Sequence, residues 1–437
     1  MLGESIRLQD VQRRLRDGEI TATELTEHCL KQIDALDGTI HAWVTVDHEG
    51  ALAAAKRMDK RVRDHRFHKR LHGIPVGVKD IVDVKGFGTH SGTDFCAREF
   101  ERESTIAKRL RGAGAIILGK TVTTPFACFD PPPTVNPIDT ELTPGGSSSG
   151  SAAGVASGMC VAAIGSQTGG SITRPASYCG VVGLKPTRGR VPLDGVTPVS
   201  FTLDHGGSIA ASVEGARQVY EVIAGYSEHD PLSADRKVES VDASCYSVSD
   251  VGVPTNLFQT DADAPTLEAF GRACARLSDQ SVHVHEIEIP WSLEELRVMH
   301  RVIMYSEAAQ YHSSLFAEHR DSYPPNLRGM IEEGMEMLAV DYAKALRFRI
   351  DFQDRLRQVM QPFDALVMPA TPTAAPRDLT TTGDPRFNAP WSLAGVPTVS
   401  VPIGGVGKPH SIQFVGHPFI ENRMLALAMM FQLGSHA

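Results

Sequence analysis

The chain has 437 residues, 42% hydrophobic and 22% charged, which is the composition of a globular protein with a large core. A net charge of −9 without a basic block argues against a nucleic-acid-binding surface. No apolar stretch approaches the ~20 residues of a membrane-spanning helix, and the N-terminus does not resemble a signal peptide. Seven scattered cysteines without a C-x-x-C pair indicate neither disulfides nor a structural zinc site. We therefore expect a cytoplasmic protein with reduced thiols that binds neither nucleic acid nor membrane.

Helix and strand patterns alternate along the first half of the chain, which favours an α/β class with a substantially parallel sheet. The clearest helix begins at a capping box formed by Thr21 and Glu24. In chain order, the patterns predict a helix at 21–37, a strand at 73–84, a helix and a strand within 104–118, a helix at 151–158 and a strand at 160–165.

The second half of the chain begins with a more polar region over residues 226–290. Strands return near the C-terminus, so we expect one sheet, and one domain, shared by residues 1–437. The predicted elements are a helix at 265–277, a strand at 282–289, helices over 293–360, strands at 364–370, 396–402 and 411–416, and a helix at 421–431.

Two short motifs match known ligand sites but lack the surroundings that those sites need. Residues 114–121, GAIILGKT, match the P-loop pattern, yet the four variable positions read as a buried strand rather than a flexible phosphate-binding loop. His65, His68 and His72 lie close together in HRFHKRLH, but the neighbouring Arg and Lys residues would repel a metal ion. We expect neither ATP binding nor a metal site, and we interpret the histidine segment as a solvated loop.

The stretch PGGSSSGSAAG, residues 144–154, has the composition of a flexible linker and contains the G-x-S-x-G pattern of a nucleophile elbow centred on Ser148. An elbow follows an apolar strand, whereas here the preceding residues are the proline-containing loop NPIDTELTP. Since no domain ends at this point, the linker interpretation is also weak. Ser148, Ser149 and Ser151 are also suited to cap the helix that follows.

Three segments have a distinctive composition: GIPVGVKD at 73–80, GGSSSGSAA at 145–153 and TGGSITRPASYCGVVGLKPT at 168–187. Together they resemble the amidase signature family of serine hydrolases, and the similarity extends over most of the chain. The resemblance implies one α/β/α domain with a large mixed, mostly parallel sheet covered by helices on both faces. Its catalytic core would span about 65–225 and a more variable region about 226–360, with residues 361–437 completing the same domain.

The resemblance also implies roles for individual residues. Ser171 corresponds to the acyl-accepting nucleophile, and Ser147, which follows a cis peptide at Gly146, corresponds to a bridging serine. Lys79 corresponds to the base. The backbone amides that would form the oxyanion hole are those of Thr168, Gly169, Gly170 and Ser171. For such a hydrolase we expect no metal and no organic cofactor.

Elementary chemistry agrees with these roles. A serine hydroxyl is a weak nucleophile unless a base removes its proton. A lysine with its reference pKa of ~10.4 cannot act as that base, but burial disfavours the charged form and lowers the pKa. Lys79 has apolar neighbours in IPVGVKDIV, although a lone lysine there is equally compatible with a side chain extended to solvent. Ser147 would pass the proton from Ser171 to Lys79 and later to the leaving nitrogen.

The chain departs from the family at two charged positions near the nucleophile. Many members have D-T-G-G-S-I-R, whereas here Gln167 replaces the acid and Thr173 replaces the arginine, with Arg174 one position later. We expect a hydrogen-bonded Gln/Thr pair in place of a salt bridge. Family members that serve as the A subunits of amidotransferases carry a segment resembling N-L-A-R-Y-D-G, which residues 304–323 do not contain. This favours a stand-alone hydrolase.

We expect the substrate to be a small molecule with a carbonyl C–N bond: an amide, a carbamate (urethane) or a urea, with esters also open to the same chemistry. The alternative is the A subunit of a glutamine-dependent aminoacyl-tRNA amidotransferase, and a homodimer is compatible with either. If nearby loops face the site, an apolar acyl or aryl substrate fits better than glutamine. For Trp391, core packing is as compatible as a binding role. The candidate substrate contacts are Phe126, Cys128, Phe129, Gly145, Gly146, Ser148, Gln167, Phe387 and Trp391, with Asn388 beside them.

Overall fold

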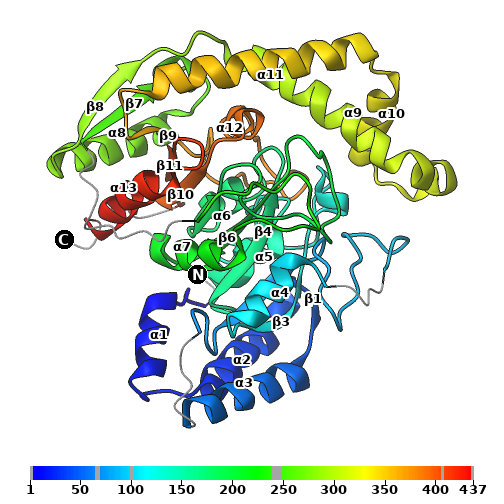
Figure 1. The fold of residues 1–437 in the computed structure, drawn as a ribbon, viewed down its shortest axis with the longest axis vertical. Helices are drawn as coiled ribbons and strands as arrows, with labels where there is room; N and C mark the ends of the chain where they lie inside the picture. The colour runs from blue at the N-terminus through cyan, green and yellow to red at the C-terminus, as the bar shows by residue number, and fades with distance from the viewer. Residues whose placement is uncertain (1–2, 64–68, 99–102, 239–248, 405–407, 435–437) are drawn as a thin grey trace.

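The computed structural model describes residues 3–63, 69–98, 103–238, 249–404 and 408–434, which form a single α/β domain (Figure 1). Its centre is one sheet of 11 strands in the order β1-β3-β2-β4-β6-β5-β10-β11-β9-β7-β8. The strands are β1 Trp43–Val46, β2 Pro75–Lys79, β3 Ile116–Thr121, β4 Ala162–Gln167, β5 Val182–Lys185, β6 His205–Ala210, β7 Asp250–Pro254, β8 His283–Ile287, β9 Ala365–Pro369, β10 Thr398–Pro402 and β11 Ser411–Val415.

Both ends of the chain contribute to this sheet, because the C-terminal strands β10 and β11 lie between β5 and β9. This confirms the expectation of one shared, mixed sheet. The expectation that it is mostly parallel was wrong: four strand pairings are parallel and six are antiparallel. A parallel pair needs a crossover, usually a helix, whereas residues 186–204 return from β5 to β6 without one.

Helices cover both faces of the sheet. On one face α7 packs on β4, β5 and β6 and against α1, α4 and α13, whereas on the other α5 packs on β2, β3 and β4 and against α6. The long helices α9 and α11 contact α12 and form the upper edge of Figure 1. Among the described helices, none is both long and apolar enough to cross a bilayer. The helices are α1 Leu8–Arg16, α2 Ala22–Ile40, α3 His48–Arg63, α4 Thr105–Gly112, α5 Ser149–Ala156, α6 Thr173–Tyr178, α7 Val213–Ile223, α8 Ala264–Asp279, α9 Leu293–His319, α10 Pro325–Glu336, α11 Ala339–Met360, α12 Ala389–Ala394 and α13 Glu421–Leu433, with short 3-10 turns η1 Pro125–Ala127, η3 Thr255–Leu257 and η4 Arg320–Ser322.

Local sequence signals account for several of these boundaries. The predicted capping box begins α2: the Thr21 side chain accepts a hydrogen bond from the Glu24 amide, and the Thr21 amide donates to the Glu24 carboxylate at 2.8 Å. A second capping box, formed by Ser292 and Glu295, begins α9. The predicted small-residue helix is α5, and every residue of it is buried, since only small side chains let a helix approach the sheet so closely.

The P-loop pattern lies in a buried strand, as the sequence predicted. Gly119, Lys120 and Thr121 are the last residues of β3, and all are buried. The ammonium of Lys120 forms an ion pair of 2.8 Å with Asp80, and both side chains are fully buried. Lys120 therefore neutralises a buried carboxylate and is not available to a nucleotide phosphate.

The histidine segment differs from its interpretation as a solvated loop. His65 and His68 lie outside the described residues. His72 is only 2% exposed, and its Nε2 lies 3.1 Å from the backbone carbonyl oxygen of Met58. His72 lies two residues before the fully buried Ile74, where the chain passes into the core. This position explains why the His72 side chain is covered.

Candidate active site

Two neighbouring parallel strands bring the predicted catalytic groups together. Lys79 is the last residue of β2 and Gln167 is the last residue of β4. Because β2 and β4 pair in parallel, their carboxyl ends lie at the same edge of the sheet. The loop 168–171 therefore begins next to the end of β2, and the loop before α5 places Ser147 against Lys79.

A cavity of about 670 Å³ opens at this edge of the sheet, and both Ser147 and Ser171 line it. Its wall mixes apolar side chains with several charged groups that come mainly from α9 and from the loop before α12. A site of this size and composition suits a small molecule that carries polar groups. The charged wall residues are Arg174, Arg297, Arg301, Arg386, Asp261, Glu294 and Asp384.

Lys79 is fully buried, and its ammonium nitrogen lies 2.7 Å from the Ser147 hydroxyl and 2.9 Å from the Ser166 hydroxyl. Within the described chain, Lys79 forms no ion pair, so nothing nearby strongly stabilises its positive charge. Burial consequently lowers the pKa of Lys79 from 10.5 to about 7, while more distant contributions from Cys128 and Asp204 oppose the shift. A lysine with this pKa can accept a proton near neutral pH.

The two serines that follow the cis peptide Gly146–Ser147 point in different directions. The Ser147 hydroxyl accepts a hydrogen bond from Lys79, and Ser147 lines the cavity. Ser148 is fully buried, and its hydroxyl contacts the backbone of Ser166 at 3.3 Å. The elbow interpretation of Ser148 is therefore excluded by its position, since an elbow serine must reach the substrate.

The loop 168–171 presents backbone donors to the cavity. In the described part of the chain, the amides of Gly169, Gly170 and Ser171 donate no hydrogen bond, which leaves them free for a substrate oxygen. Side chains from distant segments fix the loop: the Thr168 hydroxyl donates to Asp204 at 2.5 Å, and Nε2 of His300, which also lines the cavity, lies 2.9 Å from the Thr168 carbonyl. Since a carbonyl only accepts, His300 must carry its proton on Nε2.

Gln167 and Thr173, which replace the charged pair of the family pattern, are hydrogen-bonded to one another as expected. The Gln167 amide oxygen accepts from the Thr173 hydroxyl at 3.1 Å and from the amides of Ile172 and Thr173 at 2.8 and 3.0 Å. The Gln167 amide nitrogen contacts the Ser392 hydroxyl at 3.3 Å. One neutral side chain thus fixes the turn that follows Ser171.

Arg174 occupies an unusual position for a cation. It lines the cavity, is only 5% exposed, and donates from Nη2 to the Gly146 carbonyl at 2.7 Å and to the Thr382 hydroxyl at 3.2 Å. Its Nε and Nη1 atoms are buried without a hydrogen-bond partner among the described residues. Burial lowers the pKa of Arg174, with partial compensation from Tyr178 and Asp384.

Most of the predicted substrate contacts are not on the cavity wall. Cys128 and Phe129 do line the cavity and stay predicted contacts. Phe126 is 1% exposed and packs edge-on against His312, with ring centroids 4.5 Å apart, so it belongs to the core. The remaining six candidates are buried and are not among the residues that line this cavity: Gly145, Gly146, Ser148, Gln167, Phe387 and Trp391.

Sequence reasoning did not find Ser166, Asp204 and His300. Ser166 lies near the end of β4, and the parallel pairing of β4 with β2 brings its hydroxyl to Lys79. The available signal was a polar residue directly after the small and apolar run AAIG, at a strand end that leads into the serine loop. Asp204 and His300 come from distant segments, and nothing in their local sequence marks them. Asn388, noted only as a neighbour of the candidate contacts, donates to the Ala370 carbonyl at 2.9 Å behind the loop 168–171.

Comparisons with known proteins identify the family of the chain. The sequence model of the family described as Amidase matches residues 24–425. An amidase of Pseudomonas putida is 35% identical, covering 97% of this chain and 95% of that protein. The A subunit of the glutamyl-tRNA(Gln) amidotransferase of Carboxydothermus hydrogenoformans is 31% identical, covering 97% and 96%. The structure of the peptide amidase of Stenotrophomonas maltophilia matches with a TM-score of 0.85 and 28% identity, covering 99% and 97%.

The chain therefore belongs to the amidase signature family. It is an amidase-family enzyme that acts on carbon–nitrogen bonds, and the 11-stranded mixed sheet is the fold of that family.

Proposed function

We propose that the chain is a stand-alone hydrolase that opens the C–N bond of a small amide, carbamate or urea through an acyl-enzyme on Ser171. The observation that carries the proposal is the buried Lys79, whose Nζ lies 2.7 Å from Ser147, on the wall of the cavity that Ser171 also lines. Because the pKa of Lys79 is about 7, a large fraction of the amine is neutral near neutral pH.

The contact between Lys79 and Ser147 supports the following proposed proton path. Ser171 Oγ attacks the substrate carbonyl carbon as its proton passes to Ser147, while the Ser147 proton passes to Lys79. The resulting oxyanion accepts hydrogen bonds from the free amides of the loop 168–171. The C–N bond then breaks as the proton returns through Ser147 to the leaving nitrogen, and water hydrolyses the Ser171 ester by the same path in reverse.

Labelling with a fluorophosphonate, read by peptide mass spectrometry, tests the assignment of the nucleophile. We expect an adduct on Ser171 in the wild type, none in Ser171→Ala, and greatly slowed labelling in Ser147→Ala. Ser148→Ala is the matched control, because Ser148 is adjacent to Ser147 but points into the core. An adduct on Ser148, or labelling that is independent of Ser147, would contradict the proton path.

We further infer that the substrate carries a hydrogen-bond acceptor, such as a carbonyl or carboxylate oxygen, close to the scissile bond. Arg174 lines the cavity with two buried nitrogens that have no partner in the described chain, and an unmade hydrogen bond from a buried charged group is costly. Both nitrogens are covered in the structure, so an acceptor on the substrate would satisfy them once the guanidinium turns toward the cavity. The mixed, charged wall also supports a polar substrate more than the apolar acyl or aryl group expected from the sequence.

A pair of substrates that differ only in this acceptor tests the role of Arg174. In the wild type, the substrate with the acceptor should have the higher kcat/KM. In Arg174→Met we expect the ratio of the two kcat/KM values to fall about 10- to 100-fold, which corresponds to the loss of one hydrogen bond to a charged group. A purely structural role through the Gly146 carbonyl would slow both substrates equally. An unchanged preference would therefore refute the contact.

A glutamine-hydrolysing component of an amidotransferase is the second candidate, because the A subunits of such enzymes are similar over 97% of the chain. The two candidates differ in one measurement. A stand-alone enzyme hydrolyses its substrate as a purified chain, or as a homodimer, in EDTA and without ATP. Release of ammonia from glutamine only after a partner protein is added would instead favour the second candidate.

A further inference from the structure

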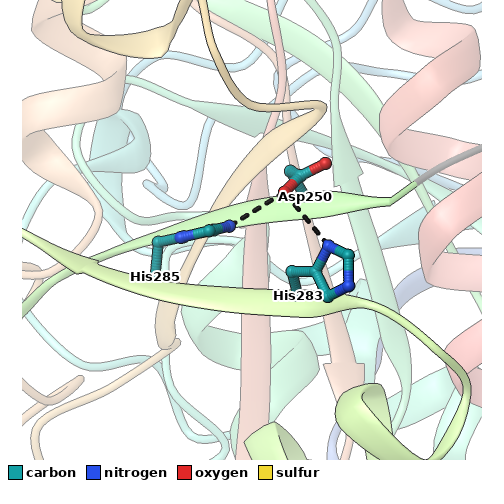
Figure 2. Close-up of side chains that lie close together, drawn as sticks. All are labelled: Asp250, His283 and His285. Carbon is teal, nitrogen blue, oxygen red and sulfur yellow. Dashed lines mark hydrogen bonds and ion pairs between the residues drawn. The ribbon is translucent and has the colours of Figure 1, made fainter.

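A second cluster of chemically reactive side chains lies far from the cavity, at the last two strands of the sheet. His283 and His285 are two residues apart on β8 and therefore point to the same face of the strand. Asp250 begins the neighbouring parallel strand β7 and lies in register with His283. Figure 2 shows both imidazoles turned toward the Asp250 carboxylate. In sheet order, β8 is eight strands away from β2, which carries Lys79.

The donor atoms of this cluster have the spacing of a metal-binding site. His285 Nε2 and His283 Nδ1 lie 2.8 and 3.4 Å from Asp250 Oδ1, and all three donor atoms are within 4.8 Å of one another. Zinc binds such atoms at about 2.0–2.2 Å, which puts neighbouring ligands about 3.4 Å apart in a tetrahedral site. Small side-chain movements would therefore let one ion replace the two direct contacts.

Neighbouring groups hold two of the three ligands in place, as outer partners do in metal sites. The Ser249 hydroxyl donates to Asp250 Oδ2 at 2.6 Å, which leaves Oδ1 directed at the histidines. The Phe363 ring lies 5.7 Å from the His285 ring and covers one side of it. Gly252, opposite His285 in register, has no side chain there, and a Cβ at Gly252 would collide with Leu366 at 2.8 Å.

We propose that Asp250, His283 and His285 bind one divalent transition-metal ion, with zinc as the representative. Two imidazoles and one carboxylate select the class, because such ligands suit zinc, cobalt, nickel and copper, whereas magnesium and calcium prefer oxygen alone. The His283 and His285 side chains are 72% and 48% exposed, so solvent reaches the site and can supply the remaining ligands.

The position of the site defines what the ion would do. Among the described strands, β8 is the last of the sheet and pairs with β7 alone, so a bound ion would link this edge strand to the rest of the sheet. At their other ends, β7 and β8 lead to Asn256 and Ser292, which line the catalytic cavity. The ion would thus stabilise the base of a ribbon that carries part of the cavity wall, without taking part in hydrolysis.

Calorimetric titration of untagged, EDTA-treated protein with Zn²⁺ tests this proposal. We expect one ion per chain and a rise in Tm that saturates with zinc. The double variant His283→Gln/His285→Gln should weaken binding at least about tenfold, since even changes to outer partners of metal ligands cost 10- to 100-fold. His48→Gln is the matched control, because His48 is an exposed histidine that contacts one carboxylate, Asp34 at 2.9 Å.

Cobalt gives a second readout that does not depend on stability. Co²⁺ should produce visible absorption bands in the wild type and in His48→Gln, and these bands should be absent from Asp250→Asn and from the double histidine variant. Wild-type protein that binds no zinc, or variants that bind zinc and cobalt as the wild type does, would overturn the proposal. Hydrolysis should be unchanged in EDTA in either case, so failure of this proposal is separate from failure of the proposed catalytic function.

Discussion

Replacing Lys79 by methionine should abolish activity and yet make the protein more stable at neutral pH. The reason is the cost of keeping a lysine at a fully buried position. The pKa of Lys79 is about 7 in the folded protein and 10.5 when exposed, and this difference corresponds to about 5 kcal/mol. Methionine has a similar length and no charge. It loses the two hydrogen bonds to Ser147 and Ser166, worth about 1 kcal/mol each, which leaves a net gain of about 3 kcal/mol.

The pH dependence distinguishes this explanation from a general packing effect. Between pH 7 and 10.5 the unfolded chain binds a proton at Lys79 that the folded chain largely lacks, so the contribution of Lys79 to wild-type stability rises with pH by up to about 1.4 kcal/mol per pH unit. Lys79→Met lacks this contribution. The stability advantage of the variant should therefore shrink steadily from pH 7 to pH 9, as measured by urea unfolding followed by intrinsic fluorescence.

Lys120 offers a matched control on the adjacent strand. It is also a fully buried lysine, but it is paired with Asp80 at 2.8 Å. Lys120→Met leaves that carboxylate buried without its partner and should destabilise the protein by about 3–5 kcal/mol. If both methionine variants changed stability in the same direction, or if the gap between wild type and Lys79→Met were constant from pH 7 to 9, the depressed pKa of Lys79 would be refuted.

Three further predictions concern the site and its support. The value of kcat/KM should fall on the acid side of the pH profile with a midpoint near pH 7, because Lys79 must be neutral to accept a proton. A midpoint near pH 4 or 5 would indicate a carboxylate base instead. Gly170→Ala should lower kcat about 100-fold, because the added Cβ would lie 2.6 Å from Asn388 Oδ1 and displace the loop 168–171. Circular dichroism should show an unchanged fold, and a near-wild-type kcat would exclude a role for this loop. Glu421→Gln breaks a buried ion pair with Arg190, so it should lower the midpoint of urea unfolding and leave the activity of the folded protein unchanged. A loss of kcat at full stability would contradict a purely structural role for Glu421.

The family resemblance and the periodic patterns predicted much of the fold. The capping box at Thr21, the buried strand in the P-loop pattern and the small-residue helix after Ser148 are each local signals, and each is confirmed. The direction of the strands was predicted less well. A strand pattern reports which faces are buried, but not whether its neighbour runs parallel or antiparallel, and the return from β5 to β6 leaves no periodic signal.

The candidate site also contains some residues that the sequence indicated and others that it did not. Lys79, Ser147 and Ser171 could be proposed from the sequence because the segments that carry them resemble the amidase signature family, and the structure brings Lys79 and Ser147 into contact. Phe126, Phe387 and Trp391 could not be assigned correctly, because large apolar side chains near an active-site loop are equally suited to the core, and here they are in the core.

By itself, the sequence determined the family of this protein and the segments to which the proposed chemistry is assigned: two glycine-rich segments with serines, a lysine among apolar neighbours, and the helices and strands that hold them. Only the tertiary structure decided the quantities on which that chemistry depends. The pKa of Lys79, the unpartnered nitrogens of Arg174 and the meeting of Asp250 with His283 and His285 all arise from segments far apart in the chain. Burial and electrostatic interaction depend on distance in space, which no local pattern of residues records.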